Sequence, residues 1–300
     1  MEKRYNQFND FLKEKFGERT LKICIDGGFT CPNRDGRCGV GGCTFCGERG
    51  SGENTKNIDI ETQVKNHLNS YRGQRANKFI AYFQNFSNTY ADVDVLKRRY
   101  DKALIDDRIV ALSVATRPDC INEEIVNLLK EYQKKYYVYV ELGFQTVNEE
   151  VAKKFNRGYT NEDFIKTVEL LNKANIDVVT HIMVGLPYEE KDDVINTVKF
   201  INSLKIMGVK IHSTYVIKGT QLEELYNNKK YIPLELSEYV DKVCEIISNL
   251  REDIIVCRIT GDAPKNLLVA PSWNLHKKII LNSITKALND RNIVQSDAFK

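Results

Sequence analysis

The sequence lacks any long apolar run: no stretch of its 300 residues approaches the roughly 18 consecutive apolar side chains that a membrane-spanning helix requires. The first twenty residues, MEKRYNQFNDFLKEKFGERT, are charged and amphipathic, and they contain neither the apolar centre nor the cleavage site of a secretion signal. These absences argue against a membrane protein and against a secreted one. We therefore expect the chain to stay in the cytoplasm.

The chain also has little net charge and no low-complexity tract. Its 44 Lys and Arg residues nearly balance its 41 Asp and Glu residues, and the net charge of +3 permits a nucleic-acid partner without requiring one. Hydrophobic residues make up 42% of the sequence and charged residues 28%, which is typical of a soluble globular protein. Although 300 residues is long for one ordinary domain, a barrel-type α/β domain reaches that length.

Short β-branched or aromatic runs alternate with helical patterns, which predicts βα units and a parallel sheet. We expect strands at residues 21–26, 78–83, 109–115, 137–144, 177–184 and 209–216. The clearest helical patterns between them are IETQVKNHLNSY, NEEIVNLLKEYQ, TNEDFIKTVELLNK and KDDVINTVKFINSLK. Six units are fewer than the eight that close a TIM barrel, so the fold class we predict is α/β, an open (β/α)6 partial barrel of the TIM type.

This pattern divides the chain into three segments. Residues 1–20 are expected to form a helical extension, residues 21–225 the partial barrel, and residues 226–300 a C-terminal α/β extension packed on the barrel. Helical patterns in the last segment cover residues 237–250 and 276–289, and the run IIVCRITGD between them predicts one more strand.

Glycine, proline and polar residues follow the predicted strands at the points where those strands end. They are Gly27–Gly28, Gln84–Asn85, Arg117–Pro118–Asp119, Gln145–Thr146 and Gly185–Leu186–Pro187. Because the loops after the strands build the active site in parallel βα proteins, we expect the active site at this edge of the sheet.

Five of the eight cysteines lie between Cys24 and Cys46, a clustering that favours a metal or cluster site over disulfides in a reducing compartment. Cys43 and Cys46 are spaced so that both thiolates can hold one metal centre. Cys31 can return as a third ligand, because the intervening loop is rich in glycine. Three thiolates on a four-iron cluster leave one iron open for a substrate or cosubstrate.

A structural zinc site is the alternative interpretation of this loop. Cys31, Cys38, Cys43 and Cys46 together could form a closed tetrahedral site, and spacing alone does not decide between zinc and a cluster. A zinc ribbon, however, usually comes with a small β fold, whereas this loop opens a series of βα units. The context therefore favours the cluster, for which Cys38, Cys43 and Cys46 form a rival ligand set.

The stretch ICIDGGFTCPNRDG…GGCTFC resembles the signature of a bacterial group of radical S-adenosylmethionine (SAM) proteins. That group is related to the catalytic subunit of elongator, which modifies the wobble uridine of tRNA. Further motifs recur in order over about residues 21–225: YFQNFSNTYA, ATRPD, ELGFQT, NRGYT, HIMVGLP and VIKGTQL. The resemblance implies a [4Fe–4S] cluster and SAM as cofactors, with Cys31, Cys43 and Cys46 as the cluster ligands. Cys38 departs from the family pattern, and Cys31 is preferred because it lies in the CPNRDG segment.

The resemblance also implies which residues bind SAM. Arg157, in NRGYT, is similar to the family arginine that pairs with the SAM carboxylate, a group to which a guanidinium is suited. Gly185 and Pro187 would bring backbone close to the adenine. Gln84 and Asn85 correspond more loosely to positions that contact the SAM amino group.

Two further SAM contacts are predicted on the fourth strand. Glu141 and Gln145 share one face of this strand because side chains alternate with a period of two. A charge on a barrel-facing strand is costly without a partner, which favours a ligand role, and we assign both residues to the SAM ribose and amino group. His181, on the fifth strand, is interpreted as a core histidine rather than a catalytic one.

Arg117, after the third strand, and Lys218, after the sixth, are the candidates for substrate contact. The resemblance implies tRNA as the substrate, radical chemistry on the C5 side chain of the wobble uridine, and an electron donor such as flavodoxin or ferredoxin. Basic patches at residues 72–78, 97–102 and 277–278 are compatible with phosphate binding, although charged helix faces are the commoner explanation of each. The alternatives are a radical SAM enzyme with a small-molecule substrate and a non-catalytic zinc or iron–sulfur protein.

Overall fold

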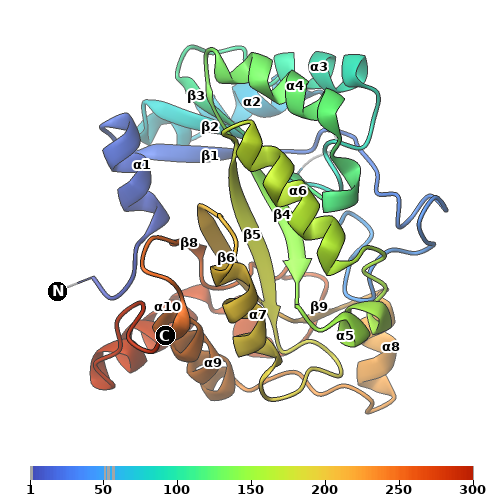
Figure 1. The fold of residues 1–300 in the computed structure, drawn as a ribbon, viewed down its shortest axis with the longest axis vertical. Helices are drawn as coiled ribbons and strands as arrows, with labels where there is room; N and C mark the ends of the chain where they lie inside the picture. The colour runs from blue at the N-terminus through green and yellow to red at the C-terminus, as the bar shows by residue number, and fades with distance from the viewer. Residues whose placement is uncertain (1–2, 51, 53–54, 56–57, 300) are drawn as a thin grey trace.

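A parallel seven-stranded sheet forms the centre of the computed structural model, which describes residues 3–299 except 51, 53–54 and 56–57. The strands lie in the order β1-β2-β3-β4-β5-β6-β8, and every neighbouring pair is parallel. Figure 1 shows that the direction of the strands changes strongly from β1 to β5, so that the sheet curls into a half-barrel. Their bounds are β1 (Thr20–Ile25), β2 (Lys78–Phe83), β3 (Ile109–Thr116), β4 (Tyr137–Gln145), β5 (Asp177–Val184), β6 (Gly208–Ser213) and β8 (Ile255–Arg258).

Helices connect the strands and cover the outer face of the sheet. On β4, Val138, Val140, Leu142 and Phe144 belong to the main core beneath these helices, whereas the alternate residue Tyr139 belongs to a separate core on the inner face. The main covering helices are α2 (Ile60–Asn69), α3 (Val93–Asp101), α4 (Glu123–Gln133), α6 (Asn161–Lys173), α7 (Asp193–Asn202), α9 (Leu236–Asn249) and α10 (Lys277–Asp290).

The N-terminal helix α1 (Phe8–Phe16) packs on the inner face and contacts both edge strands, β1 and β8. Phe8 and Leu12 of α1 form a small core with Tyr139 and other inward side chains, and the Phe8 and Tyr139 rings lie 6.1 Å apart. The segment before α1 also pairs with the edge of the sheet, because Val256 of β8 donates its N–H to the Asn6 carbonyl oxygen at 2.8 Å. One end of the half-barrel is thereby filled with apolar side chains.

The remaining elements are short and lie mostly near the opposite, C-terminal ends of the strands. They are α5 (Glu149–Lys154), α8 (Gln221–Asn227), the antiparallel pair β7 (Val216–Ile217) and β9 (Leu268–Ala270), and the single turns η1 (Gly73–Arg75), η2 (Pro118–Cys120) and η3 (Ser272–Leu275). Among the residues described, no helix is both long and apolar enough to cross a membrane.

The predicted α/β partial barrel is confirmed, and the sheet has one strand more than the six we expected. The additional strand is β8, which comes from the segment predicted to be an extension packed on the barrel. It pairs in parallel with β6, so this segment contributes directly to the central sheet. The domain boundaries at residues 20 and 225 stay predictions.

Candidate functional site

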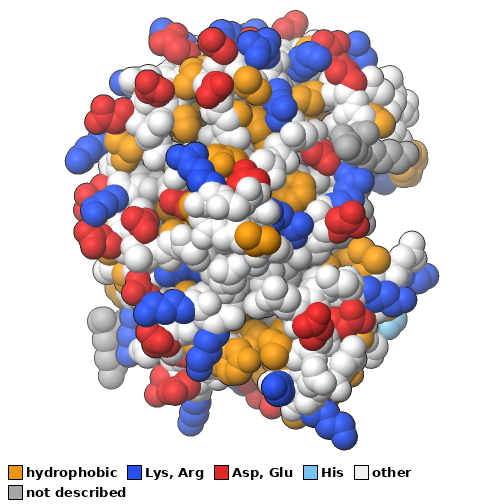
Figure 2. All heavy atoms as spheres, turned by 90° about the vertical axis from the view of Figure 1, so that its right-hand side faces the viewer, with side chains coloured by type: hydrophobic (Ala, Val, Ile, Leu, Met, Phe, Trp, Pro, Cys, Tyr) orange, Lys and Arg blue, Asp and Glu red, His pale blue; other side chains and the backbone are white. Residues whose placement is uncertain are grey.

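The loops that carry the predicted site residues lie at one edge of the sheet. Because the seven strands are parallel, the segments that follow β1 to β6 all leave the sheet from the same side. Figure 2 views the molecule from the right-hand side of Figure 1, toward which β1 runs. On this face Lys and Arg side chains are interspersed with Asp and Glu rather than gathered in a single patch.

The cysteine loop follows β1 and places three of the predicted thiols near one another. Cys31, Cys43 and Cys46 are all partly exposed, and none forms a disulfide. Burial and the nearby thiols of Cys46 and Cys31 raise the pKa of Cys43 to about 12, while the positive charge of Arg117 opposes this. Since a metal-bound cysteine is a thiolate, loading a cluster on this loop must release protons. The three thiols are thus close enough to influence one another and lie at the open edge of the barrel.

The zinc alternative requires a tighter arrangement of ligands. In the part of the chain that the structure describes, no three His, Cys, Asp or Glu side chains are placed to hold a single metal ion. Cys38 is exposed, and its sulfur lies 3.8 Å from Oδ2 of Asp119. A four-iron cluster occupies more space than one ion and takes one thiolate on each of three irons, so the spread of Cys31, Cys43 and Cys46 fits it better.

A buried polar network fixes the base of the cysteine loop. Asp26, directly after β1, accepts from Arg49 at 2.8 Å and from the side-chain amide of Asn85 at 3.0 Å. Asn85 also donates to Thr55 at 2.9 Å, and it packs so closely on Gly52 that a Cβ there would clash. The structure therefore places Asn85 as an anchor of the loop, and its contact with the SAM amino group stays a prediction.

Arg157 and Arg117 hold the segment between α5 and α6 against the ends of β3 and β4. The Arg157 guanidinium is buried and donates to the carbonyl oxygens of Tyr159, Phe144 and Thr146 and to the Asn161 side chain, at 2.9–3.1 Å. These bonds use four of its five N–H donors, so a contact with the SAM carboxylate has one donor left.

Arg117 binds both oxygens of Asp119, at 2.9 and 2.7 Å, and the backbone of Arg157 at 2.8 Å. It lies near the thiols of Cys31 and Cys43, and its positive charge favours the thiolate form of Cys43. Its position at the mouth of the barrel agrees with a substrate contact, which stays a prediction. Lys218, the other candidate, is exposed beyond β7, where its N–H donates to Leu267 at 2.9 Å.

Glu141 lies at the centre of a polar layer inside the half-barrel. Its buried carboxylate accepts from Lys22 of β1 at 2.8 Å, from His181 of β5 at 2.9 Å, from Ser113 of β3 at 3.4 Å and from Lys210 of β6. Burial alone would raise the pKa of Glu141, but Lys210 and Lys22 outweigh it and hold that pKa well below its usual range. Glu141 is therefore already paired by protein side chains.

Two lysines share this single carboxylate, which leaves one cation without a full partner. Burial lowers the pKa of Lys210 to about 7, although Glu141 opposes the shift, so Lys210 titrates near neutral pH. Burial and the neighbouring Lys210 also lower the pKa of His181 to about 4, which agrees with a neutral core histidine. Lys22 and Lys210 were not among the predicted site residues. Their alternation with apolar neighbours on β1 and β6 was the signal that could have found them.

Gln145 is the last residue of β4, and Gln84 directly follows β2. Gln145 adopts a left-handed backbone conformation with φ of 67°, and its side-chain amide lies 3.1 Å from the Tyr159 hydroxyl. That hydroxyl also donates to the Gly143 carbonyl oxygen at 2.8 Å. The backbone N–H of Gln84 donates to Ile25 of β1 at 3.1 Å. The predicted contacts of Gln145 and Gln84 with SAM stay predictions.

The turn after β5 is stabilised by the buried carboxylate of Glu189. Glu189 accepts from the backbone N–H groups of Gly185 at 2.8 Å and Leu186 at 3.2 Å, and burial raises its pKa to about 7. Gly185 has φ of 82°, and a Cβ there would lie 2.9 Å from the Leu234 side chain, so the position requires glycine. Pro187 is buried in the same turn, whose proposed approach to the adenine stays a prediction.

Comparisons with known proteins agree with the predicted fold and family. The model of the Radical SAM superfamily matches residues 33–201, and that of the Radical_SAM C-terminal domain matches residues 206–290. YtqA of Bacillus subtilis is 40% identical over 304 aligned residues, covering 100% of this chain and 94% of that protein. A tRNA uridine(34) acetyltransferase of Methanocaldococcus jannaschii is 34% identical over 168 residues, covering 55% of this chain and 30% of that protein. Among solved structures, Elp3 of Methanocaldococcus infernus superposes with a TM-score of 0.71 at 19% identity, covering 92% of this chain and 64% of that chain.

Proposed function

Because the chain belongs to the radical SAM superfamily, whose enzymes use a [4Fe–4S] cluster and SAM, we propose that it modifies the C5 side chain of the wobble uridine of tRNA. The observation that carries the tRNA assignment is the 34% identity to a tRNA uridine(34) acetyltransferase across 168 residues. The matched part is 30% of that relative, so the proposal takes the tRNA target and the radical chemistry but not acetyl transfer.

Different residues of this chain would bind the cluster and bind SAM. We propose that Cys31, Cys43 and Cys46 bind three irons of the cluster and leave the fourth for SAM. When bound and reduced, such a cluster would supply the electron for reductive cleavage of SAM to a 5′-deoxyadenosyl radical. The Gly185 turn, fixed by Glu189, offers backbone to the adenine.

The shape of the barrel supports a substrate that is part of a large RNA. The half-barrel is open where the strands end, whereas α1 fills the other end with apolar side chains. A splayed nucleotide of a single-stranded loop can enter such an opening, while the rest of the RNA stays outside. Cys24 shares the inner face of β1 with Lys22 and is solvent-exposed, so part of the interior of the half-barrel is accessible. A flavodoxin or ferredoxin as the electron donor and a cytoplasmic location complete the proposal.

The test compares tRNA nucleosides by mass spectrometry in three strains. One lacks the gene, one is complemented with the wild-type gene, and one carries the Cys43→Ala variant. We expect the final C5-modified wobble uridine only in the complemented strain, with its precursor accumulating in the other two. Identical nucleoside profiles would reject tRNA as the substrate and favour the small-molecule alternative. The radical SAM activity is tested separately by reductant-dependent formation of 5′-deoxyadenosine in anaerobically reconstituted protein.

A further inference from the structure

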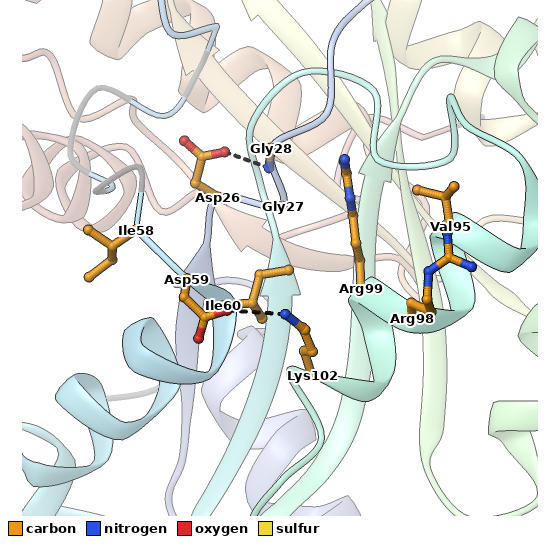
Figure 3. A pocket seen from close by; sticks show the side chains of 10 residues that line it. All are labelled: Asp26, Gly27, Gly28, Ile58, Asp59, Ile60, Val95, Arg98, Arg99 and Lys102. Carbon is orange, nitrogen blue, oxygen red and sulfur yellow. Dashed lines mark hydrogen bonds and ion pairs between the residues drawn. The ribbon is translucent and has the colours of Figure 1, made fainter.

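A hollow of about 700 Å³ lies beside the cysteine loop, between α2 and α3, and the function proposed above does not use it. Its base is formed by Asp26, Gly27 and Gly28, which lead from β1 into the cysteine loop. Figure 3 shows Arg99 and Lys102 extending from α3 toward Gly28 and Asp59, respectively, with Arg98 beside them. The hollow is thus lined by Arg98 and Arg99 of α3 and by Lys102, which directly follows that helix, and it opens next to the loop of the predicted cluster ligands.

The two carboxylates in the hollow are already paired. Asp26 is buried and accepts from Arg49 at 2.8 Å, from Asn85 at 3.0 Å and, through its other oxygen, from the N–H of Gly28 at 3.0 Å. Asp59 lies 3.3 Å from Lys102 and caps α2 by accepting from the N–H of Thr62 at 3.2 Å. Neither carboxylate is therefore left to balance the remaining cations.

Arg98 and Arg99 supply those remaining positive charges. Neither guanidinium forms an ion pair with any residue that the structure describes, whereas Lys97 on the same helix pairs with Asp101 at 2.6 Å. Arg99 is held in place because its guanidinium lies over the Phe29 ring, 4.3 Å from the ring centroid. A preordered guanidinium fork with a second arginine beside it matches the geometry of a phosphate group.

We propose that this hollow binds a backbone phosphate of the RNA substrate. The inference rests on the proposed tRNA function and adds a docking point for the RNA beside the cysteine loop. A concave site suits a phosphate and its sugar, whereas a protein partner buries roughly 800 Å² of surface with an apolar centre. The large apolar side chain that the lining exposes is Ile58, which is 40% accessible. A phosphate bound here would keep the RNA next to the mouth of the barrel.

The test measures binding of an anticodon stem-loop RNA to anaerobically reconstituted protein at several salt concentrations. The variant is Arg98→Gln/Arg99→Gln, with Arg98→Gln and Lys97→Gln as matched single variants. Lys97→Gln removes one positive charge from the same helix without touching the hollow. We expect the Kd of the double variant to rise roughly tenfold and its salt slope to fall by about 1. Lys97→Gln should change the Kd less than about twofold. Iron content and thermal unfolding verify that each variant is folded.

The outcomes separate this inference from the function on which it rests. If wild-type protein does not bind the RNA, the tRNA proposal fails and the phosphate site fails with it. If wild-type protein binds but the double variant behaves like Lys97→Gln, the phosphate site is wrong and the tRNA proposal stands. A loss of flavodoxin-driven SAM cleavage relative to dithionite-driven cleavage, with normal RNA binding, would assign the hollow to an acidic protein partner and overturn the inference.

Discussion

The charge imbalance around Glu141 predicts that removing the carboxylate and removing one of its two lysines destabilise the protein to very different extents. Glu141→Gln leaves Lys22 and Lys210 facing each other inside the barrel without a carboxylate. Lys210→Met instead leaves Glu141 paired with Lys22 at 2.8 Å and His181 at 2.9 Å, and the methionine chain fills much of the space of the lysine. The first change should therefore destabilise the protein strongly and the second only slightly.

The expected magnitudes follow from the burial of the group. The Glu141 side chain is 0% exposed and that of Lys210 is 7% exposed, so water does not screen the unpaired charges. Breaking a buried ion pair by removing one partner costs about 3–5 kcal/mol, which lowers Tm by roughly 6–20 °C in a protein of this size. Lys210→Met should cost less than about 1.5 kcal/mol. The double variant Glu141→Gln/Lys210→Met should recover part of the loss, because one unpaired cation remains instead of two.

The effect of pH gives an independent check. The folded-state pKa of Lys210, about 7, lies below the value near 10.4 of an unfolded lysine. Above pH 7 the unfolded chain therefore binds the extra proton, and this group makes the free energy of unfolding rise with pH by up to about 1.4 kcal/mol per unit. The difference in free energy of unfolding between wild type and Lys210→Met should show this rise from pH 7 upward, because groups that do not interact with Lys210 titrate alike in both proteins.

The free energy of unfolding of the reduced, cluster-free protein is measured by reversible denaturant unfolding, followed by circular dichroism at several pH values from 6 to 9. A Lys210→Met variant as unstable as Glu141→Gln, or a flat difference curve, would refute the charge imbalance. SAM binding to the folded Glu141→Gln variant tests the earlier assignment of Glu141 to SAM in the same experiment.

Three further outcomes are expected. Cys31→Ala should abolish reductant-dependent formation of 5′-deoxyadenosine and lower the iron content, whereas Cys38→Ala should leave both largely intact; the reverse would show that Cys38 is the third ligand. Arg157→Ala should lose four buried hydrogen bonds and about 3 kcal/mol or more of stability, measured by denaturant unfolding, while unchanged SAM affinity of the folded variant would remove Arg157 from the SAM site. Glu189, with a pKa near 7 rather than 4.3, makes stability fall as pH rises from 4.3 to 7, so Glu189→Gln should flatten that part of the stability curve, and an unchanged curve would contradict the raised pKa.

The positions of strands and helices could be predicted from sequence because apolar residues recur clearly with the strand period of two and the helix period of 3.6. Two strands, Lys78–Phe83 and Asp177–Val184, begin and end where expected, and α4 and α6 are capped by Asn122 and Thr160, the first residues of the helical patterns predicted there. The seventh strand was recognised as a strand, but its place in the sheet was not. Periodicity identifies β8 without saying which strand it pairs with, and that pairing depends on contacts distant in sequence.

The site was harder to predict because its side chains depend on partners far along the chain. Alternation placed Glu141 on the inner face, but Lys22 and Lys210, which neutralise it, lie 119 and 69 residues away. Arg157 was predicted to bind the SAM carboxylate, which stays a prediction; its bonds to backbone carbonyl groups were not foreseen, because only the folded end of β4 presents those groups. Asn85 likewise contacts Asp26 and Thr55 of the cysteine loop. A sequence motif can identify such residues, but their hydrogen-bond partners are known only once the chain is folded.

The packing of the N-terminal segment against β8 and against residues near the C-terminus also constrains how the chain folds during synthesis. Besides the bond from Val256 to Asn6, Arg4 pairs with Asn289 at 2.9 Å and with the backbone of Gln295 at 2.8 Å. During synthesis these partners emerge last, so the N-terminal segment must wait, unpaired, until the end of the chain leaves the ribosome. Without the N-terminal segment the edge of β8 has no cover, and an uncovered strand edge can template pairing with another chain. Deleting residues 1–18 should therefore produce aggregates during expression rather than a soluble, inactive enzyme.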